Sequence, residues 1–200
     1  MVQRNRLRQW ARDHFALQRW FNELARWCFE KKLPLLIIAI AGLATLLLFS
    51  LVKGLLIISF FIGLGAASLQ YNRFIRTSLG IELITIGVVI TGRLYGPGVA
   101  VFVGFVSLFL GELLSGSLQH KTVVSFIAIV AIGLLTQNFA GASIAAEGIW
   151  LIVIYDIIIA PGYLLLGSNP LRTGIFVVTH IAFGIWLFTA VAPFVHSFFA

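Results

Sequence analysis

Long apolar runs separated by short polar or glycine-containing stretches fill the chain from Leu33 onward. The runs cover residues 33–52, 54–69, 81–94, 99–114, 123–139, 144–166 and 173–198. Most of them approach or exceed the ~20 apolar residues that a helix needs to cross a bilayer. The pattern therefore predicts an all-α protein, a polytopic membrane bundle of about six or seven transmembrane helices spanning residues 33–200.

Residues 1–32 have a different pattern and form a separate segment. Arginines recur at every seventh position on one face of the expected helix, and a stripe of mainly aromatic and apolar residues lies on another face: Trp10, His14, Leu17, Phe21, Leu24 and Cys28. This arrangement predicts a basic amphipathic helix that lies at the membrane surface. Docking of the same helix onto a cytoplasmic partner is the alternative.

The stretch 33–69 has two interpretations. Lys53 and Gly54 interrupt about 36 otherwise mostly apolar residues, which would form a helix roughly 54 Å long. Either the chain turns tightly at Lys53-Gly54 and crosses the membrane twice, or it forms one long kinked element that lies partly in the interface. Ser59, Gly63 and Ala67 form a row of small residues at four-residue spacing, which favours close helix packing.

The stretch Tyr95–Gly116 is the most strongly patterned part of the chain. Gly96-Pro97-Gly98 predicts a turn, because proline cannot donate a backbone hydrogen bond and glycine accepts unusual backbone angles. The helix after the turn carries small residues on one face, which allows another helix to approach closely in lipid. These residues are Ala100, Gly104, Ser107, Gly111 and Ser115.

Composition supports the membrane assignment and limits the function. Hydrophobic residues make up 60% and charged residues 10% of the chain, against about 25% charged in soluble domains. No nucleophile motif, phosphate loop or metal-ligand spacing is present, so neither an enzyme, nor a cofactor, nor a metal site is expected. The net charge is +7, and residues 1–33 hold eight of the fourteen basic residues. The expected partner of this charge is the lipid bilayer with its anionic headgroups; nucleic acid is not expected.

Ionisable residues inside the apolar runs are the candidate site. A charge in the hydrocarbon costs several kcal/mol, so such residues usually face a cavity or a partner. The candidates for substrate binding are Glu82, Glu112, Asp156 and His180, all on the side of the loops 70–79, 116–122 and 167–172. Basic residues in those loops are candidates for a lid: Arg73, Arg76, Lys121 and Arg172. A buried acid favours a small solute with a hydrogen-bonding or cationic group. Structural ion pairs, helix capping and snorkelling are the alternative interpretations of these residues.

From about residue 54 to 198 the chain resembles the S components, the substrate-binding membrane subunits of energy-coupling-factor transporters. The resemblance depends on Thr77-Ser78-Leu79-Gly80-Ile81, the stretch from Gly92 to Gly98 and the small-residue helix that ends at Gly116. It implies capture of a vitamin-class or micronutrient solute at the outer face of the cell membrane. It also implies a membrane coupling subunit, which the row Ser59, Gly63 and Ala67 would contact, and ATPase subunits on other chains.

Two other functions fit the same sequence. A structural or assembly protein would use its small-residue faces to bind partner helices, and a stand-alone proton- or cation-coupled carrier would use Asp156 and Glu112. Topology distinguishes them in part. If residues 33–69 cross twice, the polar loops share the cytoplasmic side with the basic N-terminus, as the positive-inside rule favours. If they cross once, those loops lie outside, as in the S components.

Overall fold

The computed structural model describes residues 20, 23, 33–74, 79–139 and 141–199, and every element in these ranges is a helix. The expected all-α fold is therefore confirmed. The chain divides into two units, Met1–Gly54 and Leu55–Ala200. The predicted amphipathic helix within 1–32 lies outside the described residues, except for Trp20 and Glu23.

The first long helix, α2, runs from Leu33 to Ser68 over 36 residues and continues through Lys53 and Gly54. The tight turn considered at that point is therefore wrong. A glycine inside a helix costs only about 1 kcal/mol, and a lysine side chain extends away from apolar surroundings. Within the first unit, all side chains from Ile37 to Lys53 are exposed.

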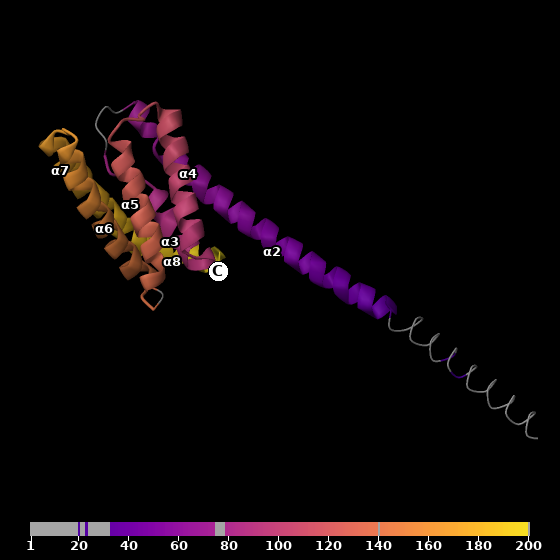
Figure 1. The fold of residues 1–200 in the computed structure, drawn as a ribbon. Coiled ribbons are helices and arrows are strands. Elements are labelled where there is room, and N and C mark those ends of the chain that lie inside the picture. The colour runs from indigo at the N-terminus through magenta and orange to yellow at the C-terminus, as the bar shows by residue number, and fades with distance from the viewer. Residues whose placement is uncertain (1–19, 21–22, 24–32, 75–78, 140, 200) are drawn as a thin grey trace, which may run out of the picture. The chain divides into compact units, whose positions relative to one another are not determined.

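The second unit is a bundle whose central helix is α3, Ile84–Tyr95 (Figure 1). All eight residues from Ile84 to Thr91 are buried, so α3 is surrounded by other helices on every side. The elements that follow α3 in the bundle are α4 (Pro97–Ser115), α5 (Thr122–Leu135), η3 (Thr136–Phe139), α6 (Ile144–Leu165), α7 (Pro170–Trp186), the π-helical η4 (Leu187–Val191) and α8 (Ala192–Phe199).

Five helical segments of the described chain are long and apolar enough to cross a membrane, which indicates a multi-pass membrane protein. They are Ile37–Arg73, Pro97–Ser115, Thr122–Phe139, Ile144–Leu165 and Pro170–Phe199. At 12 residues, α3 is shorter than these five segments. Its burial inside the bundle explains why it need not match the full bilayer thickness on its own.

The helix boundaries follow glycine and proline with one exception. Gly96, with φ +92°, separates α3 from α4, and Pro97 begins α4, so the predicted turn is confirmed. Gly116, with φ +69°, ends α4 in the left-handed conformation. Pro161 does not end α6, which continues through it to Leu165. A proline so close to the end of a helix disturbs few of the helix's hydrogen bonds.

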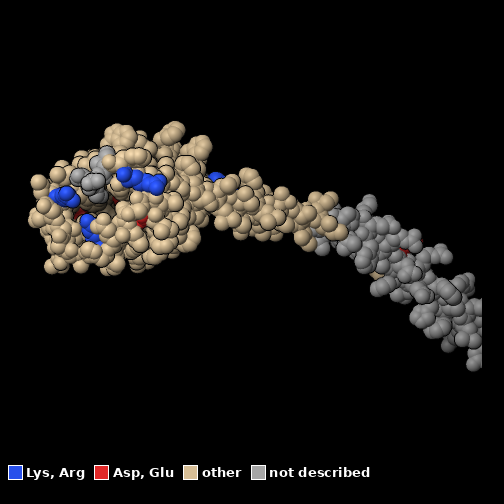
Figure 2. Space-filling model, turned by 90° about the horizontal axis from the view of Figure 1, so that it is seen from above, with Lys and Arg blue, Asp and Glu red and all other residues tan. Residues whose placement is uncertain are grey.

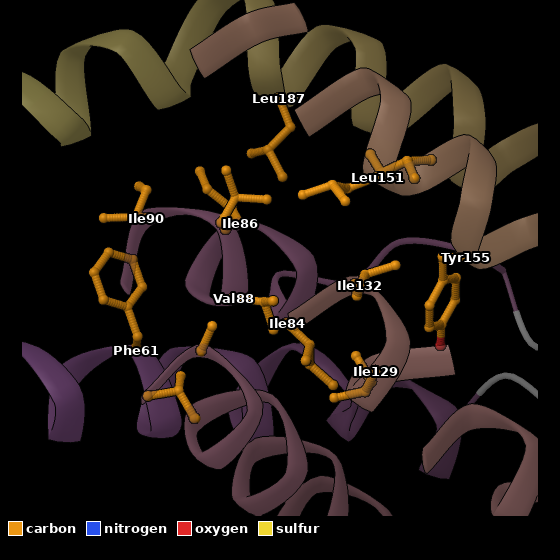
Figure 3. Packing of buried hydrophobic residues seen from close by; sticks show 14 of the residues in the cluster. Phe61, Ile84, Ile86, Val88, Ile90, Ile129, Ile132, Leu151, Tyr155 and Leu187 are labelled. Carbon is orange, nitrogen blue, oxygen red and sulfur yellow. The ribbon is translucent and has the colours of Figure 1, made fainter. Parts of the chain in front are cut away.

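The core packs aliphatic side chains around α3, as Figure 3 shows for Ile86, Ile132 and Leu151. The small residues of α4 allow this packing. A Cβ atom at Gly104 would lie 2.6 Å from side-chain carbons of Val88 and Ile129, so only glycine fits there. Of the predicted α4 face, Ala100, Gly104, Ser107 and Gly111 are buried and Ser115 is half-buried.

The small-residue row on α2 lies elsewhere. Ser59, Gly63 and Ala67 are all exposed, and no atom lies within 4 Å of a Cβ placed at Gly63. The face of α2 that packs onto the bundle carries Gly65 instead, where a Cβ would lie 2.9 Å from Ser107.

Candidate functional site

Three connections meet at one end of the second unit, which we call the loop end: the described residues 70–74 and 79–83, residues 116–121 and residues 166–169. His120 Nε2 lies 3.4 Å from the carbonyl oxygen of Leu166, and the Lys121 ammonium lies 5.7 Å from the centre of the Tyr163 ring. Seen from this end, basic side chains surround a region in which acidic side chains are visible (Figure 2). The loop end therefore combines a positive rim with negative groups inside it.

Three ionisable side chains from three segments meet beneath the loop end. His180 of α7 donates from Nδ1 to Asp156 Oδ1 of α6 over 2.9 Å. On the other side of the imidazole ring, Nε2 lies 3.5 Å from Glu82 Oε1, which is an ion-pair distance without a well-aligned hydrogen bond. All three are buried, with 1%, 4% and 5% of His180, Asp156 and Glu82 exposed. We call Glu82, Asp156 and His180 the acid–histidine cluster.

The backbone of residues 79–83 packs closely against α7, and this packing positions Glu82. A Cβ atom at Gly80 would lie 2.6 Å from both Cα and N of His180, so glycine is required for this approach. The Gly80 N–H also donates to the Thr179 hydroxyl over 2.9 Å. On the α2 side, the Leu83 N–H donates to Ser68 Oγ over 3.0 Å, and Tyr71 donates to the carbonyl of Leu79. The position of Glu82 is therefore fixed from two sides.

The cluster contains polar atoms that the protein leaves without a hydrogen bond. Glu82 Oε1, Asp156 Oδ2 and His180 Nε2 are all inaccessible to solvent and lack a hydrogen-bond partner among the described residues. Toward the loop end, the hydroxyls of Thr173 and Ser168 are in the same condition. Such atoms are rare in folded proteins and need an explanation. Thr173 lies seven positions before His180 on the same face of α7, so these polar groups extend from the cluster toward the loops.

Aromatic rings enclose the cluster. The Phe176 ring stacks on the His180 imidazole with 5.5 Å between ring centres and 21° between planes. The Tyr155 ring centre lies 5.1 Å from that of His180. Tyr163 lies 6.2 Å from Phe176, and its hydroxyl is 2.7 Å from Ser125 Oγ. The imidazole of the cluster thus lies against aromatic rings as well as carboxylates.

The other predicted site residues do not join the cluster. Glu112 is half-buried and accepts a hydrogen bond from Ser117 over 2.7 Å at the end of α4. Among the predicted lid residues, Arg73 and Arg172 are exposed and Lys121 is half-buried near Tyr163. Arg76 lies outside the described residues.

The opposite end of the bundle, with Gly96 and residues 141–143, is called the turn end. An ion pair at the turn end was not predicted from the sequence. Arg93 in the last turn of α3 lies with its Nε 3.2 Å from Glu147 Oε2 in the first turn of α6, and it also donates to the carbonyl of Ala142. Only 1% of Glu147 is exposed. Both residues flank short connections on one side of the membrane, which was the available signal for pairing them.

The cluster is better suited to holding a charged group than a metal ion. The two carboxylates approach opposite nitrogens of one imidazole, so they cannot converge on a common centre. Accordingly, among the described residues, no three His, Cys, Asp or Glu side chains are placed to hold a metal ion. When both acids are ionised, the cluster carries a net negative charge even with the imidazole protonated.

The helices define the class as a multi-pass α-helical membrane protein, with a buried acid–histidine cluster below one end of its bundle. No family model, no curated protein and no solved structure matches the chain. What the protein does is therefore inferred from the geometry of the cluster.

Proposed function

We propose that the protein is a membrane-embedded subunit that captures a small solute, in the manner of an S component, and has no catalytic activity of its own. The observation that carries the proposal is the acid–histidine cluster, with buried carboxylate oxygens that lack a hydrogen-bond partner among the described residues beneath the loop end. Membrane and ATPase subunits on other chains would supply transport energy, and the cell membrane is the expected location.

A purely structural role explains the cluster less well. Buried ion pairs stabilise a protein only when further hydrogen bonds satisfy the remaining polar atoms. In this cluster one oxygen of each acid has no hydrogen-bond partner in the described chain. Ionisable groups inside a membrane protein are costly and usually serve a substrate or ion, so a bound solute supplies the missing partners.

The continuity of α2 supports the orientation that capture requires. If α2 crosses the membrane once, the loop end lies on the opposite side from the N-terminus. The concentration of basic residues in 1–33 favours a cytoplasmic N-terminus. The loop end then faces outward, where a capture subunit meets its solute.

Labelling of single cysteines tests this orientation. Gln119→Cys at the loop end and Gly98→Cys at the turn end are both exposed positions, and Cys28→Ser removes the only native cysteine. With a membrane-impermeant maleimide on intact cells, we expect labelling at position 119 and none at position 98 until the cells are permeabilised. The reverse pattern would place the loop end in the cytoplasm and eliminate outward capture.

A scaffold function is the second candidate, because the exposed row on α2 offers a surface for another helix. In a scaffold, Gly63→Leu would disrupt a copurifying complex while Asp156→Asn would have no effect on it. Solute capture requires that Asp156→Asn abolish retention of a copurifying small molecule. Native mass spectrometry of the wild-type protein and both variants distinguishes the two functions.

A further inference from the structure

The proposed capture function does not specify the chemical class of the solute. The charge, the hydrogen-bonding atoms and the apolar surroundings of the acid–histidine cluster indicate that class. We infer that the solute is a small organic cation whose N–H groups donate to Glu82 and Asp156 and whose apolar part meets the aromatic rings beside them. This inference depends on the proposed function and narrows it.

The charge of the cluster indicates the charge of the solute. The cluster holds two acids and one histidine, and no arginine or lysine of the described chain forms an ion pair with either acid. A cation bound beside the imidazole, with donors toward both carboxylates, compensates the excess negative charge, and the apolar surroundings strengthen the attraction. An anion would add to the repulsion, so anionic solutes are excluded from this position.

The acceptor oxygens of the cluster indicate that the solute carries N–H donors. Glu82 Oε1 and Asp156 Oδ2 are both acceptors without a hydrogen-bond partner, and both residues are at least nine-tenths buried. Charge-assisted bonds from an ammonium or amidinium group satisfy them and are about twice as strong as neutral ones. A quaternary ammonium group has no N–H and would leave both oxygens unsatisfied.

The aromatic rings beside the imidazole favour an organic cation over an inorganic one. The rings of Phe176 and Tyr155 have their centres 5.5 and 5.1 Å from that of His180, so a cation beside the imidazole lies near aromatic faces. Aromatic faces attract cations at such distances and also bury the carbon part of an organic solute. A hard metal ion would instead require about six oxygen ligands, which the described residues do not bring together.

The test uses the full chain in detergent or nanodiscs and follows thermal unfolding with three probes. Benzamidine is a planar aromatic cation with N–H donors, benzamide is its neutral counterpart, and tetramethylammonium is a cation without donors. We expect benzamidine to raise the unfolding temperature at millimolar concentration, and the other two to do so far less.

Variants locate the effect. Asp156→Asn and Glu82→Gln should each weaken the apparent benzamidine affinity about tenfold or more, because each removes a charged acceptor. Glu147→Gln is the matched control: it removes the same charge at the turn end, and its response to benzamidine, relative to its own unliganded baseline, should equal that of the wild type.

Equal stabilisation by benzamide and benzamidine, or no stabilisation by either, would overturn the cation class. That failure is distinguishable from failure of capture itself. A neutral or anionic solute that copurifies and requires Asp156, together with an outward loop end, would preserve capture and refute only the class. A loop end labelled from the cytoplasm would refute capture whatever benzamidine does.

Discussion

Gly80 is the position at which the smallest change should have the largest effect on the site. Adding one methyl group there places a carbon 2.6 Å from the backbone Cα and N of His180. The obstacle is backbone inside helix α7, so it cannot rotate aside as a side chain would. Gly80 does not have a positive φ, so the cost of Gly80→Ala is steric and not torsional.

The expected destabilisation follows from two contributions. Forcing an extra methyl group into a packed interior costs about 1–3 kcal/mol. Separating the two segments also lengthens the 2.9 Å hydrogen bond from the Gly80 N–H to Thr179, worth about 1 kcal/mol. We therefore expect Gly80→Ala to lower the free energy of unfolding by about 2–4 kcal/mol. Glu82, two residues further along, should move away from His180.

Unfolding by sodium dodecyl sulfate, followed by tryptophan fluorescence, measures this change. Gly174→Ala is the matched control, because Gly174 lies in α7 itself and nothing surrounds its Cβ position within 4 Å. That variant should be neutral or more stable by about 0.5–1 kcal/mol, since alanine favours a helix. If Gly80→Ala and Gly174→Ala behave alike, the close contact between residues 79–83 and α7 is refuted.

Three further predictions concern the rest of the bundle. Arg93→Gln should lower the free energy of unfolding by about 3–5 kcal/mol because it leaves Glu147 buried and unpaired, and adding Glu147→Gln should recover part of this loss. Additive losses in a double-mutant cycle would refute the pairing. Gly104→Leu should prevent stable folding, judged by size-exclusion chromatography, while Gly63→Leu on the exposed face should elute as the wild type does. Tyr163→Phe should cost about 1 kcal/mol through its lost hydrogen bond to α5, and no change would show that the bond contributes nothing.

The behaviour of α2 shows why spacing alone did not determine its packing. The helix carries two rows at four-residue spacing that are offset by two positions, or about 200° around the axis. The uniformly small row was the predicted packing face, whereas the row that faces the bundle has large apolar side chains beside its glycine: Phe61 and Gly65, continued by Leu69 directly after the helix. The burial of large side chains determined which face of α2 packs onto the bundle, and the row of small residues did not.

The candidate site was predictable in its location but not in its membership. Alternation of antiparallel helices places Glu82, Asp156 and His180 near one end whatever the details of packing. Which of them meet depends on rotation of each helix about its axis, which the sequence pattern does not determine. Glu112 shares their level but bonds to Ser117. The approach of Gly80 to α7 depends on an irregular segment, so no helical period indicated it.

The distribution of polar groups along α6 bears on how a captured solute would leave. Glu147 and Asp156 are nine positions apart in this helix, about 13 Å, and belong to the two polar ends of the bundle. Between them lie Leu151 and Ile152, buried against the aliphatic side chains around α3. A carrier that passes ions on its own needs polar groups through this layer. A solute bound at the acid–histidine cluster can instead leave toward the turn end only when the bundle is moved as a whole or opened, and that work would come from partner subunits, as capture with separate ATPases requires.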